Sequence, residues 1–288
     1  MSYKTQKKVI ITGFLAIPTL LLLMFLIYPS LRMIFMSFTN WDGLFPQYDF
    51  VGLKNYEEIF TTPEIWISLR NNCVYILFSF IQNVIALSLG LILVSKMKGR
   101  AFFKVMFFIP YIINSVAVAY SFNYVYNYTH SPINIGLIAL GLQPVKFLSD
   151  ILVVNFSLAG ISMWRYFGYS MIIYIVALES VPGDLYEAAM VDGASKTQSF
   201  FYITLPSIRR TVELNLFLCV SGSLQVFVEP LVLTNGGPGY ASSTYVTYLI
   251  KAAFSFNRYS FASAMSVALI AMVLIVTTIQ RKIVLRNG

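Results

Sequence analysis

The chain has 288 residues, of which 58% are hydrophobic and 11% are charged, and its mean hydropathy is +0.73. Soluble domains carry a charge on about a quarter of their residues, so this composition excludes an ordinary water-soluble enzyme and points to lipid as the solvent. The net charge of +8 alone would fit a nucleic-acid-binding protein, but most charges cluster at the ends of long apolar runs, as in membrane proteins. The two cysteines, Cys73 and Cys219, lie in apolar stretches without metal-ligand spacing and indicate free thiols.

Six apolar runs are long enough to cross a bilayer, which takes about 20 helical residues at a rise of about 1.5 Å each. The first run is predicted to be a retained span, because no small-x-small cleavage site follows it before Pro29. We therefore expect residues 1–288 to form one all-α transmembrane domain. The predicted spans cover residues 9–28, 73–95, 105–126, 151–178, 211–234 and 259–280.

The basic residues predict that both chain ends lie in the cytoplasm of a multi-pass protein of the plasma (inner) membrane. Six spans put both ends on one side, and that side carries 13 Lys and Arg against 6 on the other. The 13 are Lys4, Lys7, Lys8, Lys96, Lys98, Arg100, Lys104, Lys196, Arg209, Arg210, Arg281, Lys282 and Arg286, and the 6 are Arg32, Lys54, Arg70, Lys146, Lys251 and Arg258. The largest cytoplasmic segment then covers residues 179–210.

Catalytic patterns are missing from the sequence. It contains no Gly-rich phosphate loop followed by a lysine, so the chain is not expected to hydrolyse nucleotides by that route. The single histidine, His130, lies in a predicted outer loop, and the serines form no catalytic set with it. We predict a chain that is not an enzyme, with no catalytic residues and no metal site.

The cytoplasmic segment has the pattern of two short amphipathic helices around a glycine. Asp184 followed by Glu187 predicts a capping box for the first helix, and Gly193 is suited to ending it. Ser195 with Gln198 predicts a second capping box, and Pro206 is expected to stop that run. From the pattern alone, the apolar faces could dock on a partner or lie on lipid headgroups.

Several motifs in this chain resemble those of one transporter family. Glu187-Ala188-Ala189, three residues, Gly193, nine residues and then Ile203-Thr204-Leu205-Pro206 match in full the EAA loop of permease subunits in binding-protein-dependent ABC importers. The carbohydrate branch of that family is also similar in Tyr186–Ala194, in Thr234-Asn235-Gly236-Gly237-Pro238 and in Ser37-Phe38-Thr39-Asn40-Trp41. The chain thus resembles, over nearly its whole length, the first of the two permeases in such importers, including the core of the maltose permeases.

The resemblance implies a type I ABC importer permease fold and a set of partners. These are a second, homologous permease, two copies of a cytoplasmic ATPase subunit and an extracytoplasmic sugar-binding protein. It further implies that the chain itself binds no cofactor, because ATP and Mg²⁺ belong to the ATPase. Its coupling residues would be Glu187, Ala188, Ala189, Asp192 and Gly193.

Two charged residues fall deep inside predicted spans, where charge is costly and usually functional. Arg165 lies 17 residues before Pro182, and Glu229 lies 18 residues after Thr211. At about 1.5 Å per residue both sit at a similar height above the cytoplasmic loop, so we expect that they could pair. The pair could hold two helices together without touching any ligand, or it could line a translocation path.

Polar and aromatic residues follow both charges at helical spacing. Ser162, Tyr166 and Tyr169 share a face with Arg165, and Ser221 and Gln225 recur with Glu229 every four residues. Hydroxyls and aromatic faces suit a sugar, and in the resembled maltose permeases the sugar contacts lie on these two helices. The predicted substrate path is therefore Ser162, Arg165, Tyr166, Tyr169, Ser221, Gln225 and Glu229.

The sequence predicts the permease subunit of an ATP-driven importer that works by alternating access. The expected cargo is a carbohydrate, and specifically an oligosaccharide. A first alternative keeps the importer class but changes the cargo to a sugar phosphate such as glycerol phosphate, for which Arg165 would be a reason. A second alternative is a stand-alone secondary transporter. The outer segment 236–258 could serve as a docking face for the binding protein or as a partly buried plug over the cavity.

Overall fold

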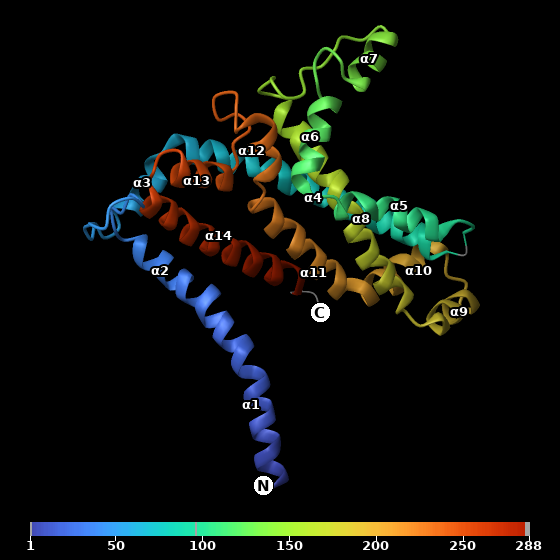
Figure 1. The fold of residues 1–288 in the computed structure, drawn as a ribbon. Helices are drawn as coiled ribbons and strands as arrows, with labels where there is room; N and C mark the ends of the chain where they lie inside the picture. Colours follow the sequence, from blue (N-terminus) through green and yellow to red (C-terminus); the bar gives the residue numbers. More distant parts are fainter. Residues whose placement is uncertain (1, 96, 286–288) are drawn as a thin grey trace. The chain divides into compact units, whose positions relative to one another are not determined.

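The structure, a computed structural model, describes residues 2–95 and 97–285 and is built of helices. Lys96 and Arg286, which enter the charge count, lie outside the described residues. Within the described residues, pairing of extended backbone is limited to one isolated bridge between Thr39 and Phe50. The elements are α1 (Tyr3–Leu22), η1 (Leu23–Ile27), α2 (Tyr28–Met36), α3 (Lys54–Thr61), α4 (Pro63–Val94), α5 (Arg100–Ile112), α6 (Ser115–Val125), α7 (Pro132–Ala139), α8 (Val154–Glu179), α9 (Gly183–Val191), α10 (Lys196–Ser199), η2 (Phe200–Thr204), α11 (Leu205–Leu224), α12 (Val228–Thr234), α13 (Tyr245–Phe254) and α14 (Tyr259–Leu285) (Figure 1).

The predicted spans are found in the described part of the chain, with one of them bent. Five helices are long and apolar enough to cross a membrane, and the total is six when α5 and α6 count as one broken span. These two helices meet at 98°, because Ile113 is extended and Asn114 starts a new helix by accepting hydrogen bonds from the N–H groups of Val116 and Ala117. The apolar run predicted over 105–126 is therefore a pair of helices with a sharp bend between them.

The fifth span begins earlier than predicted. The helical run continues from Lys196 through η2 and α11 to Leu224, so Pro206 does not stop it. Pro206 is the second residue of α11 and follows the π-helical turn η2 directly, where the regular ladder of α-helical hydrogen bonds is already interrupted. The boundary at Thr211 therefore reflects the charges of Arg209 and Arg210 and not the end of a helix.

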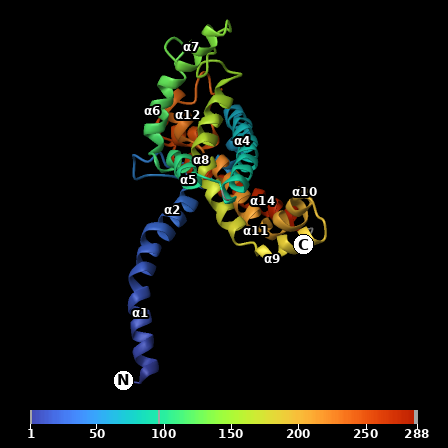
Figure 2. The ribbon, with the colours of Figure 1, turned by 90° about the vertical axis from the view of Figure 1, so that its right-hand side faces the viewer.

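The chain forms two compact units, residues 1–62 with 249–272 and residues 63–248 with 273–288. The prediction of one permease domain stays a prediction. In the second unit α4, α8 and α11 pack together at the centre, as both views show (Figures 1 and 2). Asn83 on α4 joins the three helices, because its Oδ1 accepts from Tyr174 Oη at 2.6 Å and from Asn215 Nδ2 at 2.8 Å.

Close backbone packing fixes α5 against α8. A Cβ atom built on Gly168 would lie 1.8 Å from the carbonyl oxygen of Phe107, so the helices can approach this closely only at glycine. Lys104 at the start of α5 also bonds Glu179 at the end of α8, at 3.1 Å. Helix α5, the first helix of the bent pair α5 and α6, is therefore packed closely against α8, the helix that carries Arg165.

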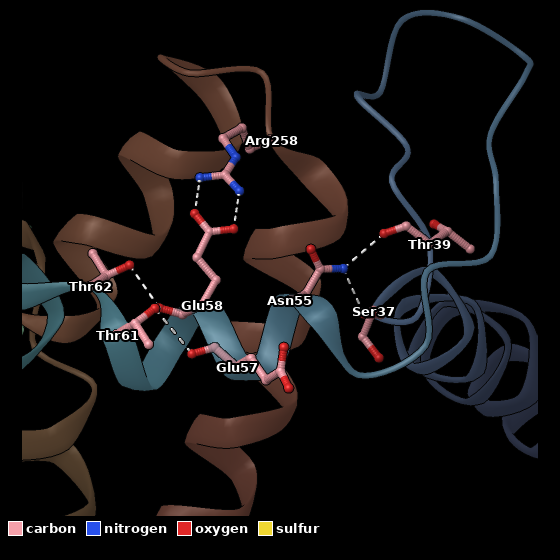
Figure 3. Close-up of polar contacts among 8 residues, drawn as sticks. All are labelled: Ser37, Thr39, Asn55, Glu57, Glu58, Thr61, Thr62 and Arg258. Atoms are coloured by element: carbon pink, nitrogen blue, oxygen red, sulfur yellow. Dashed lines mark hydrogen bonds and ion pairs between the residues drawn. The ribbon is translucent and has the colours of Figure 1, made fainter.

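The first unit is held together by polar contacts near the start of α14 (Figure 3). Glu58 on α3 makes a two-point ion pair with Arg258, with Nη1 to Oε1 at 2.6 Å. Asn55 donates to the carbonyl oxygens of Ser37 and Thr39 at 2.9 and 2.8 Å. These contacts order the predicted outer segment that follows the first span.

Candidate functional site

The fifth span is interrupted inside the second unit. Helix α11 ends at Leu224 and α12 begins at Val228, which leaves three residues of irregular backbone between them. Asn72 on α4 donates to the carbonyl oxygen of Ser223 at 2.7 Å, and Thr244 donates to that of Val226 at 2.6 Å. Irregular backbone at membrane depth is tolerated where it is buried in protein or lines a cavity.

A cavity of about 400 Å³ lies beside this break. A volume of this order is typical of small-molecule sites, which span roughly 300–1,000 Å³. The lining side chains come from α4, α5, α6, α8, α11 and α12, so the cavity is surrounded by the core of the second unit. The polar and aromatic lining residues are Tyr75, Phe78, Ser79, Gln82, Tyr111, Ser115, Ser162, Arg165, Tyr166, Tyr169, Ser170, Ser223, Gln225, Phe227 and Glu229.

Arg165 and Glu229 face each other across this cavity. Arg165 Nη1 lies 3.8 Å from Glu229 Oε1, and the two side chains are 13% and 3% exposed. Arg165 also donates from Nη1 to Tyr166 Oη at 3.3 Å and places its guanidinium 5.0 Å from the Tyr166 ring centre. The expected pairing is therefore present, and the helix break puts Glu229 in the first turn of α12, where a carboxylate is favoured by the helix dipole.

Three tyrosines supply an aromatic wall. Tyr111 on α5 stacks on Tyr169 of α8, with ring centres 4.6 Å apart and an angle of 19° between the planes. Tyr166 meets Tyr111 edge-on at 5.9 Å. Aromatic faces of this kind can stack against the C–H surface of a ligand while the tyrosine hydroxyls remain available for hydrogen bonds.

The cavity has polar atoms that lack a hydrogen-bond partner in the described part of the chain. Four buried side-chain atoms of lining residues make no hydrogen bond within the described structure, although a buried polar group without a partner costs about 1–3 kcal/mol. They are Tyr75 Oη, Ser162 Oγ, Arg165 Nε and Glu229 Oε1. Unsatisfied groups gathered at one cavity are expected where a ligand or water completes the bonding.

Six of the seven predicted path residues line the cavity, and Ser221 does not. The Oγ atom of Ser221 is buried without a hydrogen-bond partner in the described structure, and its carbonyl oxygen accepts from Gln225 Nε2 at 3.1 Å. On an unbroken helix, the spacing of four residues would put Ser221 on the same face as Gln225 and Glu229. Helix α11 ends at Leu224, before it reaches Glu229. The role of all seven in transport stays a prediction.

Sequence reasoning missed the contributions of α4 and of the bent pair. Tyr75 and Phe78 come from α4, and Tyr111 and Ser115 come from the two sides of the bend. Gln82 was expected to bond between helices, and it does donate to Ser170 Oγ at 3.0 Å, but it also lines the cavity. Spacing of four and seven residues in 75, 78, 79 and 82 was a usable signal on α4. Nothing in the sequence could show that a 98° bend brings Tyr111 to Tyr169.

The segment that was predicted to be cytoplasmic, residues 179–210, has the predicted order of helix, glycine and helix. Helix α9 covers Gly183–Val191, and Gly193 follows with φ of +76°. Its N–H bonds the carbonyl of Met190, and the N–H of Ala194 bonds that of Ala189 at 2.9 Å, which is a Schellman ending. The Ser195 and Gln198 capping box is present as predicted.

The predicted capping box at Asp184 and Glu187 is wrong. Pro182 occupies the N-cap position and makes no side-chain cap, so Asp184 instead lies in the first turn, where it complements the helix dipole. Glu187, Ala188, Asp192 and Gly193 are exposed and Ala189 is buried. Glu187 is thus available to a partner, while Ala189 belongs to the inner face of the loop.

Large apolar side chains on this loop are exposed. Val191 is 88% exposed, Tyr202 80% and Met190 71%. Tyr186 holds the two arms of the loop together through a 2.9 Å bond between its hydroxyl and that of Thr204. An ordered loop with exposed apolar groups is typical of a docking surface.

Comparison with known proteins identifies the class of this chain as a transport permease. Residues 82–286 match the family described as binding-protein-dependent transport system inner membrane component. The chain belongs to this family, whose members are membrane-embedded transport subunits and not enzymes. This membership favours the importer over a stand-alone secondary transporter and confirms the type I ABC importer permease fold and an inner-membrane, multi-pass protein.

The relatives are permeases of ABC transporters. The chain is 35% identical to the probable ABC transporter permease protein YurN of Bacillus subtilis (strain 168), with 96% of each chain covered. It is 31% identical to the trehalose/maltose transport system permease protein MalF of Thermococcus litoralis, with 94% of this chain and 92% of the relative covered. A crystal structure of a bacterial ABC transporter involved in the import of the acidic polysaccharide alginate shares the fold, with a TM-score of 0.82, 23% identity and coverage of 99% and 98%.

Proposed function

We propose that this chain is the permease subunit of an ATP-driven carbohydrate importer and that its cargo is an oligosaccharide. The observation that carries this proposal is the cavity at the break of the fifth span, with its tyrosine wall and its unpartnered polar atoms. Sugars present both hydroxyls and flat C–H faces, which such a lining can bind. Relatives named for trehalose and maltose, for multiple sugars and for diacetylchitobiose support a carbohydrate cargo.

The exposed cytoplasmic loop is proposed to couple the permease to an ATPase. Glu187, Ala188, Asp192 and Gly193 would meet a cleft of the ATPase subunit, with Ala189 packed behind them. The Schellman ending at Gly193 keeps α9 rigid, so a push on the loop would move α8 and the fifth span, to which its two ends connect. ATP and Mg²⁺ would be bound by the ATPase and not by this chain.

The remaining partners follow from this scheme. A second, homologous permease would complete the pathway, two copies of the ATPase would drive it, and an extracytoplasmic sugar-binding protein would deliver the cargo. Both termini would then lie in the cytoplasm. The cavity would open in turn to each side of the membrane, because delivery and ATP hydrolysis favour different conformations.

Uptake into proteoliposomes tests the cargo and the cavity together. Vesicles that contain the complex are given the binding protein outside, ATP inside and labelled malto-, cello- or chito-oligosaccharides. We expect ATP-dependent uptake of one group, and about a fivefold or larger loss in Tyr169→Ala, since aromatic contacts contribute on the order of 1 kcal/mol or more. Tyr120→Ala is the matched control, because Tyr120 is 66% exposed and lies outside the cavity lining. Equal uptake by both variants would contradict a ligand role for the tyrosine wall.

A further inference from the structure

The charges that line the cavity cancel. Arg165 and Glu229 are the charged residues among the described residues of the lining, and they lie 3.8 Å apart with little exposure to solvent. A carboxylate or phosphate of a ligand that approached Arg165 would meet the carboxylate of Glu229 at the same place. Like charges repel strongly in a site of low dielectric constant, so an anionic ligand is disfavoured here.

The unpartnered atoms of the pair also favour a hydroxyl. Arg165 Nε offers a hydrogen-bond donor and Glu229 Oε1 offers an acceptor, and both lack a hydrogen-bond partner within the described structure. Both atoms are buried, so a ligand reaches them only when the two side chains move apart; a hydroxyl can then accept from the first and donate to the second, whereas an ionised carboxylate only accepts. Ser162 and Tyr75 add two further unpartnered hydroxyls in the same cavity.

We propose that Glu229 is a specificity-determining residue that makes this cavity select uncharged sugars over uronic acids and sugar phosphates. The proposal rests on the proposed carbohydrate function and adds the charge of the cargo to it. Glu229 offsets the guanidinium charge of Arg165, so the cavity recognises hydroxyls without attracting anions. Likeness of fold to an importer of an acidic polysaccharide does not bear on this point, because single side chains set the charge of a cavity.

Direct binding to the membrane complex tests this selection, since the binding protein would add its own preference. The complex of this chain with its partner permease and ATPase is titrated with the neutral trimers maltotriose, cellotriose and galactotriose and with trigalacturonate. We expect the wild type to bind at least one neutral trimer about tenfold or more tighter than trigalacturonate. In Glu229→Gln, trigalacturonate should bind about tenfold tighter than in the wild type.

Arg165→Gln with Glu229→Gln is the matched control, because it removes both charges and should leave trigalacturonate binding near the wild-type value. Wild-type binding of trigalacturonate equal to or tighter than that of every neutral trimer would overturn the proposal, as would an unchanged preference in Glu229→Gln. If that variant does not assemble, the wild-type preference decides. Failure of the wild type to bind any trimer would instead count against the proposed carbohydrate function itself.

Discussion

Arg165 and Glu229 depend on each other, because each is buried and each supplies the charge that the other needs. Removing one partner of a buried pair leaves an uncompensated charge, which typically costs about 3–5 kcal/mol, whereas replacing both by apolar groups is often close to neutral. Comparing variants that lack one or both charges therefore distinguishes a structural role of the pair from a role in ligand binding. The stability of the complex should fall when only one of the two charges is removed. Transport should fall whenever an atom that binds the ligand is removed.

The first prediction compares Arg165→Met with the double variant Arg165→Met and Glu229→Leu. The single variant should lower the thermal midpoint and the yield of the complex, because Glu229 is left alone at 3% exposure. The double variant should recover most of the yield but not the uptake, since both ligand atoms are missing. Full uptake by the double variant would show that the pair only holds the helices together.

The second prediction concerns pH and the loop after the second helix. The carboxylate of Asp42 accepts hydrogen bonds from the N–H groups of Leu44 and Phe45 at 3.0 and 3.1 Å, which lowers its pKa below the ordinary value of 3.8. Because the pKa of Asp42 is lowered in the folded protein, its hydrogen bonds to the loop are fully formed at pH values above the ordinary pKa. They are lost as the pH falls through the lowered pKa of the folded protein. Trp41, whose indole N–H bonds the carbonyl of Phe45, should report this loss by fluorescence when Trp66 and Trp164 are replaced by Phe. Asp42→Ala should abolish the transition, and a transition that persists in it would contradict the assignment.

At the scale of elements, the packing of α5 on α8 and the break of the fifth span shape the cavity. The carbonyl of Phe107 on α5 lies against Gly168 on α8. Tyr111 lies four residues after Phe107 and Tyr169 one residue after Gly168, and this contact brings the two tyrosines together. The break at 225–227 is held by Asn72 and Thr244, so its irregular backbone is bonded and not loose. Thr244 is itself fully buried, as are Ser242 and Ser243, which favours the plug over the docking face for this part of the outer segment.

The third prediction uses two glycines in membrane spans. Gly168→Ala should separate α5 from α8, lower the thermal midpoint of the complex and reduce uptake, because its Cβ would overlap the Phe107 carbonyl. Gly222→Ala is the matched control, since a Cβ there meets nothing within 4 Å and alanine is favoured over glycine in helices by about 1 kcal/mol. Thermal unfolding of the purified complex measures the midpoint for each variant. Equal midpoints for the two variants would contradict the close packing of α5 on α8.

At the scale of the whole chain, the spans were predictable because hydropathy and length are set by the bilayer, and the family motif located the loop that contains α9, Gly193 and α10. The helical rise also predicted that Arg165 and Glu229 would meet. The bend at Ile113 and the break at 225–227 were not predictable, since both depend on hydrogen bonds between single side chains and backbone. Asn114 accepts from the N–H of Val116 at the bend, and Asn72 and Thr244 donate to backbone carbonyls at the break. Ser221 was misplaced for the same reason.

The fourth prediction concerns the link from the loop to the partner. Gly193→Asp should abolish uptake or release the ATPase while the permease chain remains folded, because a Cβ at Gly193 meets nothing within 4 Å. The backbone there has φ of +76°, so Gly193→Asn, which tolerates this conformation better, should be milder, and both can be compared by pull-down of the ATPase and by uptake. Normal uptake by Gly193→Asp would contradict the role of this loop.

The most direct test of the account is the ATPase activity of the reconstituted complex of this chain, its partner permease and its ATPase, with the binding protein and a panel of sugars and sugar phosphates. We expect stimulation by one group of neutral oligosaccharides and none by phosphorylated sugars. Stimulation by a phosphorylated ligand alone would recast Arg165 as an anion ligand. Failure of the chain to form any complex with an ATPase would contradict the coupling loop and the import function together.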